Sequence, residues 1–502
     1  MKSKTIFATV LGLGICLTSA VRSANAASYY VDPAGSDSNS GSSPASAWKT
    51  LAKAGSWKFQ PGDTVYLKRG GMWRETLQPM SSGTATEPIT FTAYGTGALP
   101  IINGADLVTG WNLVSGAVYS ASLSVKPYNV YSDGLPNWGL YMASSQSAMT
   151  AGSWYYNGGK LYVQLTDGSN PANHQIEAAD RQNGFYVNGA SSNNNGVAPI
   201  TFSFTAGTSN QGGNATANIN YITVNSIMTE RTGNYGVQFY DSYAPLVSDC
   251  TLTQNGTGQQ DLGYYNALHA DIAPGAIYSN NTVSWGGGHN AIQMQRADGG
   301  QILDNTVTEW NHNGIDVKLS TGITVKGNIV HDSQMGSGLY TEYVGNYNAD
   351  QNIIYNTPMG IQTNLNTTSY LFNNSMLNTN GGGIYLGPAS GGSATIENNI
   401  TYGNVVMALQ NAGNYTVSTE DYNDWGPATS SPTQVKVGSS AYNATTWMTM
   451  AGHTHDITAN PQWVNAPSNF TLQASSPCVN AGWWVGLGGM GSAPDMGAIE
   501  SY

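Results

Sequence analysis

The middle of the chain repeats an alternation of apolar and polar positions about every 23 residues. Segments with this alternation recur once per period as NAIQMQ, NGIDVK, SGLYTE, MGIQTN and GGIYLG. Alternation over six residues is typical of a strand with one buried face, and this region lacks the apolar spacing of a helix. The pattern predicts one or two short strands per repeat, stacked as a solenoid.

Asparagines recur at the same period between these strands. They are Asn281, Asn305, Asn328, Asn352, Asn374 and Asn399. An asparagine in the tight turn of one coil can hydrogen-bond the asparagine of the next coil, because its amide both donates and accepts. A repeat this short is too small for a propeller blade and fits one coil of a parallel β-helix. We therefore expect an all-β parallel β-helix solenoid.

Composition agrees with short strands and turns, since only 9% of residues are charged and glycine is abundant. Residues 1–26 contain Lys2 and Lys4, then an apolar stretch, then Ala24-Asn25-Ala26, which is typical of a secretory signal peptide. We expect a secreted protein, extracellular or periplasmic, without a membrane-spanning segment.

The remaining chain has 14 basic and 29 acidic residues, a net charge of −15. This charge disfavours nucleic acid and anionic membranes as partners.

Four regions follow the signal peptide. We expect an N-terminal cap and first coils at 27–105, an inserted β module at 106–180, central coils at 181–407, and C-terminal coils with a cap at 408–502. A helix near Trp48 to Ala54 would cover the open end of the solenoid. A hairpin in the module is expected to turn at Asn157-Gly158-Gly159. Cys250 and Cys478 either form a disulfide, which a secreted protein allows, or stay unpaired.

The two ends of the chain carry a resemblance. The opening YYVDPAGSDSNSGSSPASAWKTL with PGDTVYLKRG, and the closing NPQWV, FTLQASSPCVNAG and DMGAIE, resemble secreted bacterial right-handed parallel β-helix proteins of the pectate-lyase-like superfamily. The resemblance implies a right-handed β-helix and a polysaccharide partner. The superfamily includes polysaccharide lyases, glycoside hydrolases, uronate epimerases and phage depolymerases, so the resemblance implies no single activity.

Aligning the repeats separates inward from outward side chains, because strand residues alternate. The inward column is Ile292, Ile315, Leu339, Ile361 and Ile384. One outward column is Gln293, Asp316, Tyr340, Gln362 and Tyr385, and the next is Gln295, Lys318, Glu342, Asn364 and Gly387. Preceding coils add Gln238 and Tyr240 and, across an insertion that leaves the alignment uncertain, His269 and Asp271. We expect these columns to lie on a long outer face suited to an extended glycan.

The carboxylates on this face predict a glycoside hydrolase. Asp316 and Glu342 lie one coil and two residues apart, roughly 8 Å between backbones, which spans retaining and inverting arrangements. Asp316 would serve as nucleophile or base and Glu342 as general acid, although neighbouring Lys318 would lower the pKa of that acid. Asp271 with Asp316 is the alternative pair.

The remaining outward residues would bind the substrate. Sugar hydroxyls would bond to Gln293, Gln295, Gln362, Asn364 and His269, and sugar rings would stack on Tyr264 and Tyr265.

Other interpretations use the same residues. A lyase or epimerase acting on uronates would use Lys318 as base and Tyr340 as acid, with Asp271 and Glu342 holding calcium. A non-catalytic surface protein would bind glycans through the same face. Lys318 with Glu342 would also form an ordinary cross-strand ion pair, and Asp316 would be merely solvated. The hydrolase interpretation needs no cofactor. We expect no metal site from His289, His312 and His331, which fall in turns.

Overall fold

The computed structural model describes residues 26–134, 138–204, 212–257, 265–286, 288–388, 391–403, 407–412, 415–426, 435–450, 452–489 and 491–501. The predicted signal peptide lies outside the described residues except for Ala26, and so does Tyr264.

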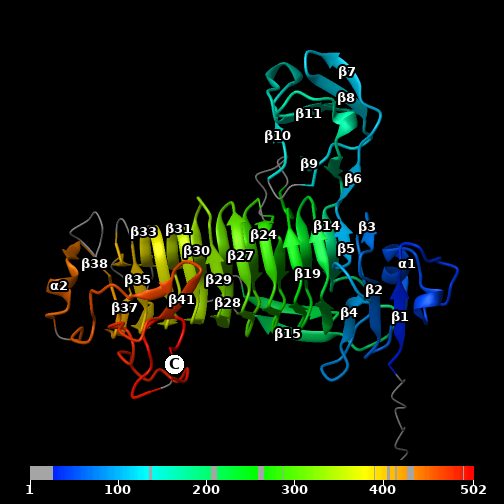
Figure 1. The fold of residues 1–502 in the computed structure, drawn as a ribbon. Coiled ribbons are helices and arrows are strands. Elements are labelled where there is room, and N and C mark those ends of the chain that lie inside the picture. Colours follow the sequence, from blue (N-terminus) through cyan, green and yellow to red (C-terminus); the bar gives the residue numbers. More distant parts are fainter. Residues whose placement is uncertain are drawn as a thin grey trace, which may run out of the picture.

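The described chain winds into a parallel β-helix whose strands stack in three faces (Figure 1). Face 1 contains β14 (Asn183–Asn188), β19 (Tyr235–Tyr240), β22 (Leu268–Asp271), β25 (Asn290–Gln295), the first halves of β28 (Asn313–Lys326) and β30 (Ser337–Asp350), the second halves of β31 (Ile353–Asn364) and β33 (Ser375–Leu386), β36 (Leu409–Asn411) and β38 (Val435–Val437). Each strand pairs in parallel with the equivalent strand of the next coil.

Faces 2 and 3 close the coil in the same way. Face 2 contains β1 (Ser28–Val31), β2 (Thr64–Lys68), β4 (Ile89–Tyr94), β17 (Ile222–Asn225), β20 (Leu246–Ser248), β23 (Ile277–Ser279), β26 (Gln301–Leu303), the second halves of β28 and β30, β32 (Thr368–Phe372), β34 (Ser393–Glu397) and β37 (Thr416–Asp421). Face 3 contains β3 (Met72–Trp73), β5 (Ile101–Asn103), β18 (Met228–Glu230), β21 (Thr251–Thr253), β24 (Thr282–Gly286), β27 (Thr306–Trp310), β29 (Ile329–His331), the first halves of β31 and β33, and β35 (Ile400–Tyr402).

The core follows the alternation in the sequence. The predicted inward column pairs residue by residue across five coils, and all five side chains are buried. Each coil adds inward apolar side chains from all three faces to one continuous core. Because a one-residue slip would turn every apolar side chain outward, this alternation fixes the register of the strands.

The predicted asparagine ladder runs along the turn between faces 2 and 3. In each step the side-chain amide of one asparagine donates to the Oδ1 of the next at 2.9–3.0 Å, from Asn281 to Asn399. That Oδ1 also accepts the backbone N–H of the preceding asparagine. The ladder continues through Asn423 to Asp456. Buried backbone groups of the turn are thus satisfied by the neighbouring coil.

A left-handed residue precedes each rung and makes the turn tight. Residues with φ between 51° and 69° stand directly before the asparagines, at Asn280, Asp304, Gly327, Gln351, Asn373 and Asn398. Glycine, asparagine and aspartate tolerate this conformation best, and they fill five of the six positions. Cys250 occupies the preceding rung, since its N–H donates to Asn281 at 3.0 Å. Both Cys250 and Cys478 are buried free thiols.

The ends of the solenoid are capped. At the N-terminal end, α1 (Leu51–Ser56) begins and ends two to three residues later than the predicted helix and buries Leu51 and Ala54. The side chain of Thr50 caps it by accepting the N–H of Lys53. At the other end, α2 (Ala444–Trp447) and the hairpin of β38 with β39 (Ser440–Tyr442) cover the last coils. The segment with β40 (Trp463–Asn465) and β41 (Asn469–Leu472) packs Phe470 on face 3.

The predicted inserted module rises between β5 and β14 and stands off the β-helix (Figure 1). One sheet has the order β10 (Tyr141–Met142), β11 (Ser153–Asn157), β12 (Lys160–Gln164), β8 (Val118–Ser122), β7 (Asn112–Ser115); the other has β6 (Ala105–Leu107), β13 (Ile176–Ala179), β9 (Asn129–Ser132). The β11–β12 hairpin turns at Gly158 and Gly159, both with positive φ, as a two-residue turn requires. A buried Arg231–Glu177 ion pair anchors the module. A shorter hairpin joins β15 (Ile200–Phe204) and β16 (Gly213–Ala217).

The fold prediction is thereby confirmed: an all-β, parallel β-helix with an N-terminal cap and an inserted β module. In the part of the chain that the structure describes, no helix has the length and apolar character needed to cross a bilayer.

Candidate functional site

The two predicted outward columns lie on face 1. Gln293, Asp316, Tyr340, Gln362 and Tyr385 are successive parallel partners. The neighbouring column pairs Gln295, Lys318, Glu342 and Asn364 in the same way. His269 pairs with Gln293 and Asp271 with Gln295, so the insertion before β22 does not shift the register.

The expectation that Asp316 is a surface carboxylate is wrong. Its side chain is outward in register yet 0% exposed. Oδ2 accepts a hydrogen bond from Nδ2 of Asn313 at 3.0 Å, whereas Oδ1 has no hydrogen-bond partner of normal geometry among the described residues. Burial raises the pKa of Asp316 to about 6, against the opposing charge of Lys318 and the hydrogen bonds from Asn313 and Gln293.

Lys318 lies between the two predicted catalytic carboxylates. Its Nζ is 3.7 Å from Oδ2 of Asp316 and 3.6 Å from Oε2 of Glu342. Because these distances add up to 7.3 Å, the two carboxylate oxygens are no farther apart than that. Lys318 is 19% exposed and Glu342 31% exposed, so of the two acids only Glu342 is open to solvent. Nζ also lies 5.4 Å from the ring centroid of Tyr340.

Tyr340 and Asp271 are held by other partners. The hydroxyl of Tyr340 accepts a hydrogen bond from Asn364 at 3.0 Å, and burial raises the pKa of Tyr340 to about 12. Both oxygens of Asp271 accept from Arg296, Oδ1 at 2.8 Å and Oδ2 at 2.5 Å. Asp271 is therefore a bidentate ion-pair partner, which disfavours its predicted roles as catalytic acid and calcium ligand.

The predicted sugar-binding residues differ in access. His269 and Gln293 are buried, and His269 stacks on Tyr235 with ring centroids 4.8 Å apart. Burial lowers the pKa of His269 to about 4, so its ring is neutral. The other four described residues, Gln295, Gln362, Asn364 and Tyr265, are partly exposed.

His289 and His312 join this site, which the sequence did not predict. They lie in the turns that lead into β25 and β28, and their rings stack with centroids 4.2 Å apart. The following asparagines contact their Nδ1 atoms, Asn290 at 2.6 Å and Asn313 at 2.8 Å. One ring nitrogen of each histidine and one oxygen of Asp316 lie within 4.8 Å of one another. The available signal was the His-Asn dipeptide repeated after 23 residues, the length of one coil.

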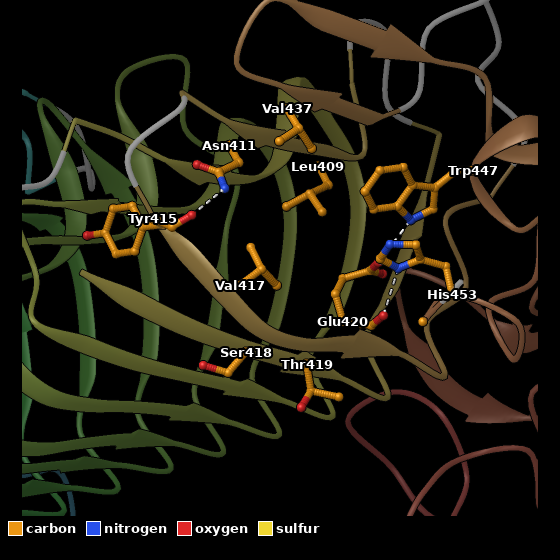
Figure 2. A pocket seen from close by; sticks show the side chains of 11 residues that line it. Leu409, Asn411, Tyr415, Val417, Ser418, Thr419, Glu420, Val437, Trp447 and His453 are labelled. Atoms are coloured by element: carbon orange, nitrogen blue, oxygen red, sulfur yellow. Dashed lines mark hydrogen bonds and ion pairs between the residues drawn. The ribbon is translucent and has the colours of Figure 1, made fainter. Parts of the chain in front are cut away.

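A second cluster of titratable groups lies at the C-terminal end of the solenoid. A cavity of about 400 Å³ lies there. Leu409, Val417 and Val437 line it, and Glu420, Trp447 and His453 gather at one end (Figure 2). Glu420 accepts from the indoles of Trp425 at 3.1 Å and Trp447 at 2.9 Å and pairs with His453.

Asp456 completes this cluster as the last rung of the asparagine ladder. It accepts the N–H of Asn423 at 2.8 Å and the indole of Trp425 at 3.0 Å. Burial, and next the negative charge of Glu420, raise the pKa of Asp456 to about 9. Asp456 therefore carries a proton at neutral pH. Since so many groups are satisfied within the cluster, we interpret it as a structural end cap.

The Asp456 proton predicts a pH dependence of stability. In the unfolded chain the proton leaves near pH 3.8 and in the folded protein near pH 9. Between these values the folded state binds more protons, so the free energy of unfolding falls as pH rises, by up to about 1.4 kcal/mol per unit. Asp456→Asn keeps a donor toward Glu420 and the acceptor for Asn423 without titrating. We expect its melting temperature to fall less between pH 5 and 9 than that of the wild type.

Thermal melts followed by circular dichroism would measure this difference. Asp167→Asn, on an exposed turn, is the matched control and should follow the wild-type curve. A slope for Asp456→Asn equal to the wild-type slope would show that Asp456 does not hold a buried proton.

Comparisons with known proteins agree with the fold. A family model described as "Right handed beta helix region" matches residues 271–422. The solved structure titled "The complex structure of XylC with xylose" superposes with a TM-score of 0.54 at 15% identity, covering 78% of this chain and 70% of that chain. Pectate lyase Pel9A gives 0.52 at 16% identity, covering 95% and 96%. No curated protein matches the chain by sequence.

At these identities the likeness concerns the fold. The three stacked faces, the family match and the pectate lyase superposition agree. The chain is a right-handed parallel β-helix protein that resembles the pectate lyases in its fold, as the two ends of the sequence indicated.

Proposed function

We propose that the protein binds a polysaccharide along face 1 and hydrolyses its glycosidic bonds, with Glu342 as the carboxylate that meets the sugar. The observation that carries this proposal is the Asp316–Lys318–Glu342 arrangement, in which one carboxylate is buried and the other exposed around one ammonium group.

We propose other roles for the two carboxylates than those predicted from the sequence. Asp316 is buried, so it acts as a positioning residue that holds Lys318 beside Glu342. Glu342 is the solvent-exposed ion-pair partner of Lys318, at 3.6 Å, and such a carboxylate suits a nucleophile or base better than the general acid predicted from the sequence. Glu342 is therefore proposed as nucleophile or base.

Two contacts favour a hydrolase over a lyase. Lys318 is the charged partner of two carboxylates, whereas a lysine base must be uncharged to take a proton. Arg296 donates to both oxygens of Asp271, the residue that the lyase interpretation needs as a calcium ligand together with Glu342. The polysaccharide partner is supported by the fold relatives, one a pectate lyase and one solved with xylose. The signal peptide expected at 1–26 would place the reaction outside the cytoplasm.

A panel of polysaccharides tests the reaction class. Reducing ends and the ultraviolet absorbance of unsaturated uronate should be followed together on the purified protein. We expect reducing ends without that absorbance, because hydrolysis adds water across the bond and leaves no double bond. A rise in both signals would indicate a lyase and return Lys318 to the role of base. Retention of a glycan without either signal would favour a binding protein.

A further inference from the structure

The turn that leads into face 1 brings two histidines over a buried carboxylate. His289 and His312 occupy equivalent positions in successive coils, and their rings stack 4.2 Å apart. Asp316 lies three positions after Asn313 in the coil of His312. The three residues can each turn one ligand atom to a common point, since these atoms lie within 4.8 Å of one another.

The carboxylate of Asp316 lacks a partner that its burial calls for. Oδ2 faces Asn313 and Lys318, and the side chain of Gln293 also lies close to the carboxylate. Among the described residues, Oδ1 nevertheless has no hydrogen-bond partner of normal geometry, although the side chain is 0% exposed. A buried carboxylate oxygen without a donor costs free energy that a bound cation would recover.

Asparagine side chains contact the ring nitrogen Nδ1 of each histidine. Asn290 lies 2.6 Å from Nδ1 of His289, and Asn313 lies 2.8 Å from Nδ1 of His312. Asn313 also donates to Asp316, so one amide orients two of the three residues. Because an amide nitrogen only donates, Nδ1 of each histidine is the acceptor in these contacts, which hold the rings in place. Coordination through Nε2 therefore needs the ring proton to pass to Nδ1 and the asparagine to turn its amide oxygen toward that N–H.

We propose that His289, His312 and Asp316 bind a divalent transition-metal ion, with Zn²⁺ the best match to two imidazoles and one carboxylate. Three protein ligands leave an open position for water or a sugar hydroxyl, as in catalytic rather than structural zinc sites. Ligand atoms of a tetrahedral zinc site lie about 3.3 Å apart on bonds of about 2.0–2.1 Å, so the rings tilt from parallel on binding. His312 is exposed and can make that movement.

This inference goes beyond the proposed function, because binding is expected whether or not the protein cleaves glycans. A second group with metal-binding residue types, Glu420, His453 and Asp456, is a weaker candidate. Its carboxylates already accept from two indoles and Asn423.

Calorimetric titration of metal-free protein with Zn²⁺ tests the proposal. We expect one ion per chain with a dissociation constant in the micromolar range or tighter. His289→Ala, His312→Ala and Asp316→Asn should each weaken binding at least tenfold. His331→Ala is the matched control: this histidine lies on face 3, pairs with Asp332 and should leave binding unchanged. Absorption of bound Co²⁺ in the visible range would report the same site independently of heat.

The comparison with the double variant His289→Ala/His312→Ala is decisive. If the wild type binds no Zn²⁺, or binds it no more tightly than this variant, the site does not exist. Circular dichroism and melting temperature in metal-free buffer confirm that the variants are folded. Because no step measures cleavage, failure of the hydrolase proposal leaves this result untouched.

Discussion

Glu342→Gln is expected to lower kcat for glycosidic bond cleavage by at least about 100-fold, the lower limit for loss of a positioned acid, base or nucleophile. Glutamine keeps the shape and partial exposure of Glu342 but cannot attack a sugar or accept a proton. Glycan affinity should stay within a few-fold, since the rest of face 1 is unchanged. Reducing-end kinetics would measure kcat, and calorimetric titration with the polysaccharide that the wild type cleaves would measure affinity.

Glu309→Gln is the matched control for this experiment. Glu309 lies on β27 of face 3, on another side of the same solenoid, so the substitution removes an equal charge away from the proposed site. Its kcat should equal that of the wild type. Full activity of Glu342→Gln would remove Glu342 from the reaction, and equal loss in both variants would indicate a general effect of charge.

Asn352→Ala is expected to lower the free energy of unfolding by about 3 kcal/mol. Its Oδ1 accepts the backbone N–H of Asn328, and its amide donates to the carbonyl of Val325 and to Asn374. Alanine leaves the N–H of Asn328 without an acceptor and removes a donor from the carbonyl of Val325. Water is excluded from this turn, and each buried group left without a partner costs roughly 1–3 kcal/mol. Urea unfolding followed by tryptophan fluorescence would measure the change.

Asn348→Ala provides the control for the ladder. Asn348 is an outward, partly exposed residue of β30, four positions from Asn352. Its removal should change the free energy of unfolding by no more than about 0.5 kcal/mol. Equal losses in the two variants would mean that the ladder contributes no more than an ordinary surface amide.

The repeated features of this protein could be predicted from the sequence because each coil of a solenoid places equivalent residues in the same environment. Ile292, Ile315 and Leu339 recur at the coil spacing and meet the same core, so their equivalence in sequence is also their pairing in space. The ladder asparagines follow for the same reason. The hairpin at Gly158-Gly159 was predicted from turn chemistry alone, which needs no distant contact.

The site was harder to predict because it depends on how deeply each outward side chain is buried. The alternation of apolar and polar positions does not indicate this. Asp316 and Tyr340 are both outward in register, yet Asp316 is fully buried and Tyr340 partly exposed. Similarly, Asp271 was placed in the correct column, but its pairing with Arg296 depends on how a residue just beyond the strand turns back.

By itself, the sequence determined the fold, the strand register and which side chains share face 1, because these follow from local alternation repeated at a constant period. Only the tertiary structure decided which of those side chains meet solvent and which meet each other. The burial of Asp316, the position of Lys318 between two acids and the stacking of His289 on His312 all arise where neighbouring coils and turns close over face 1. Such contacts depend on side-chain directions and on the solvent they exclude, and neither is a property of a residue's place in the repeat.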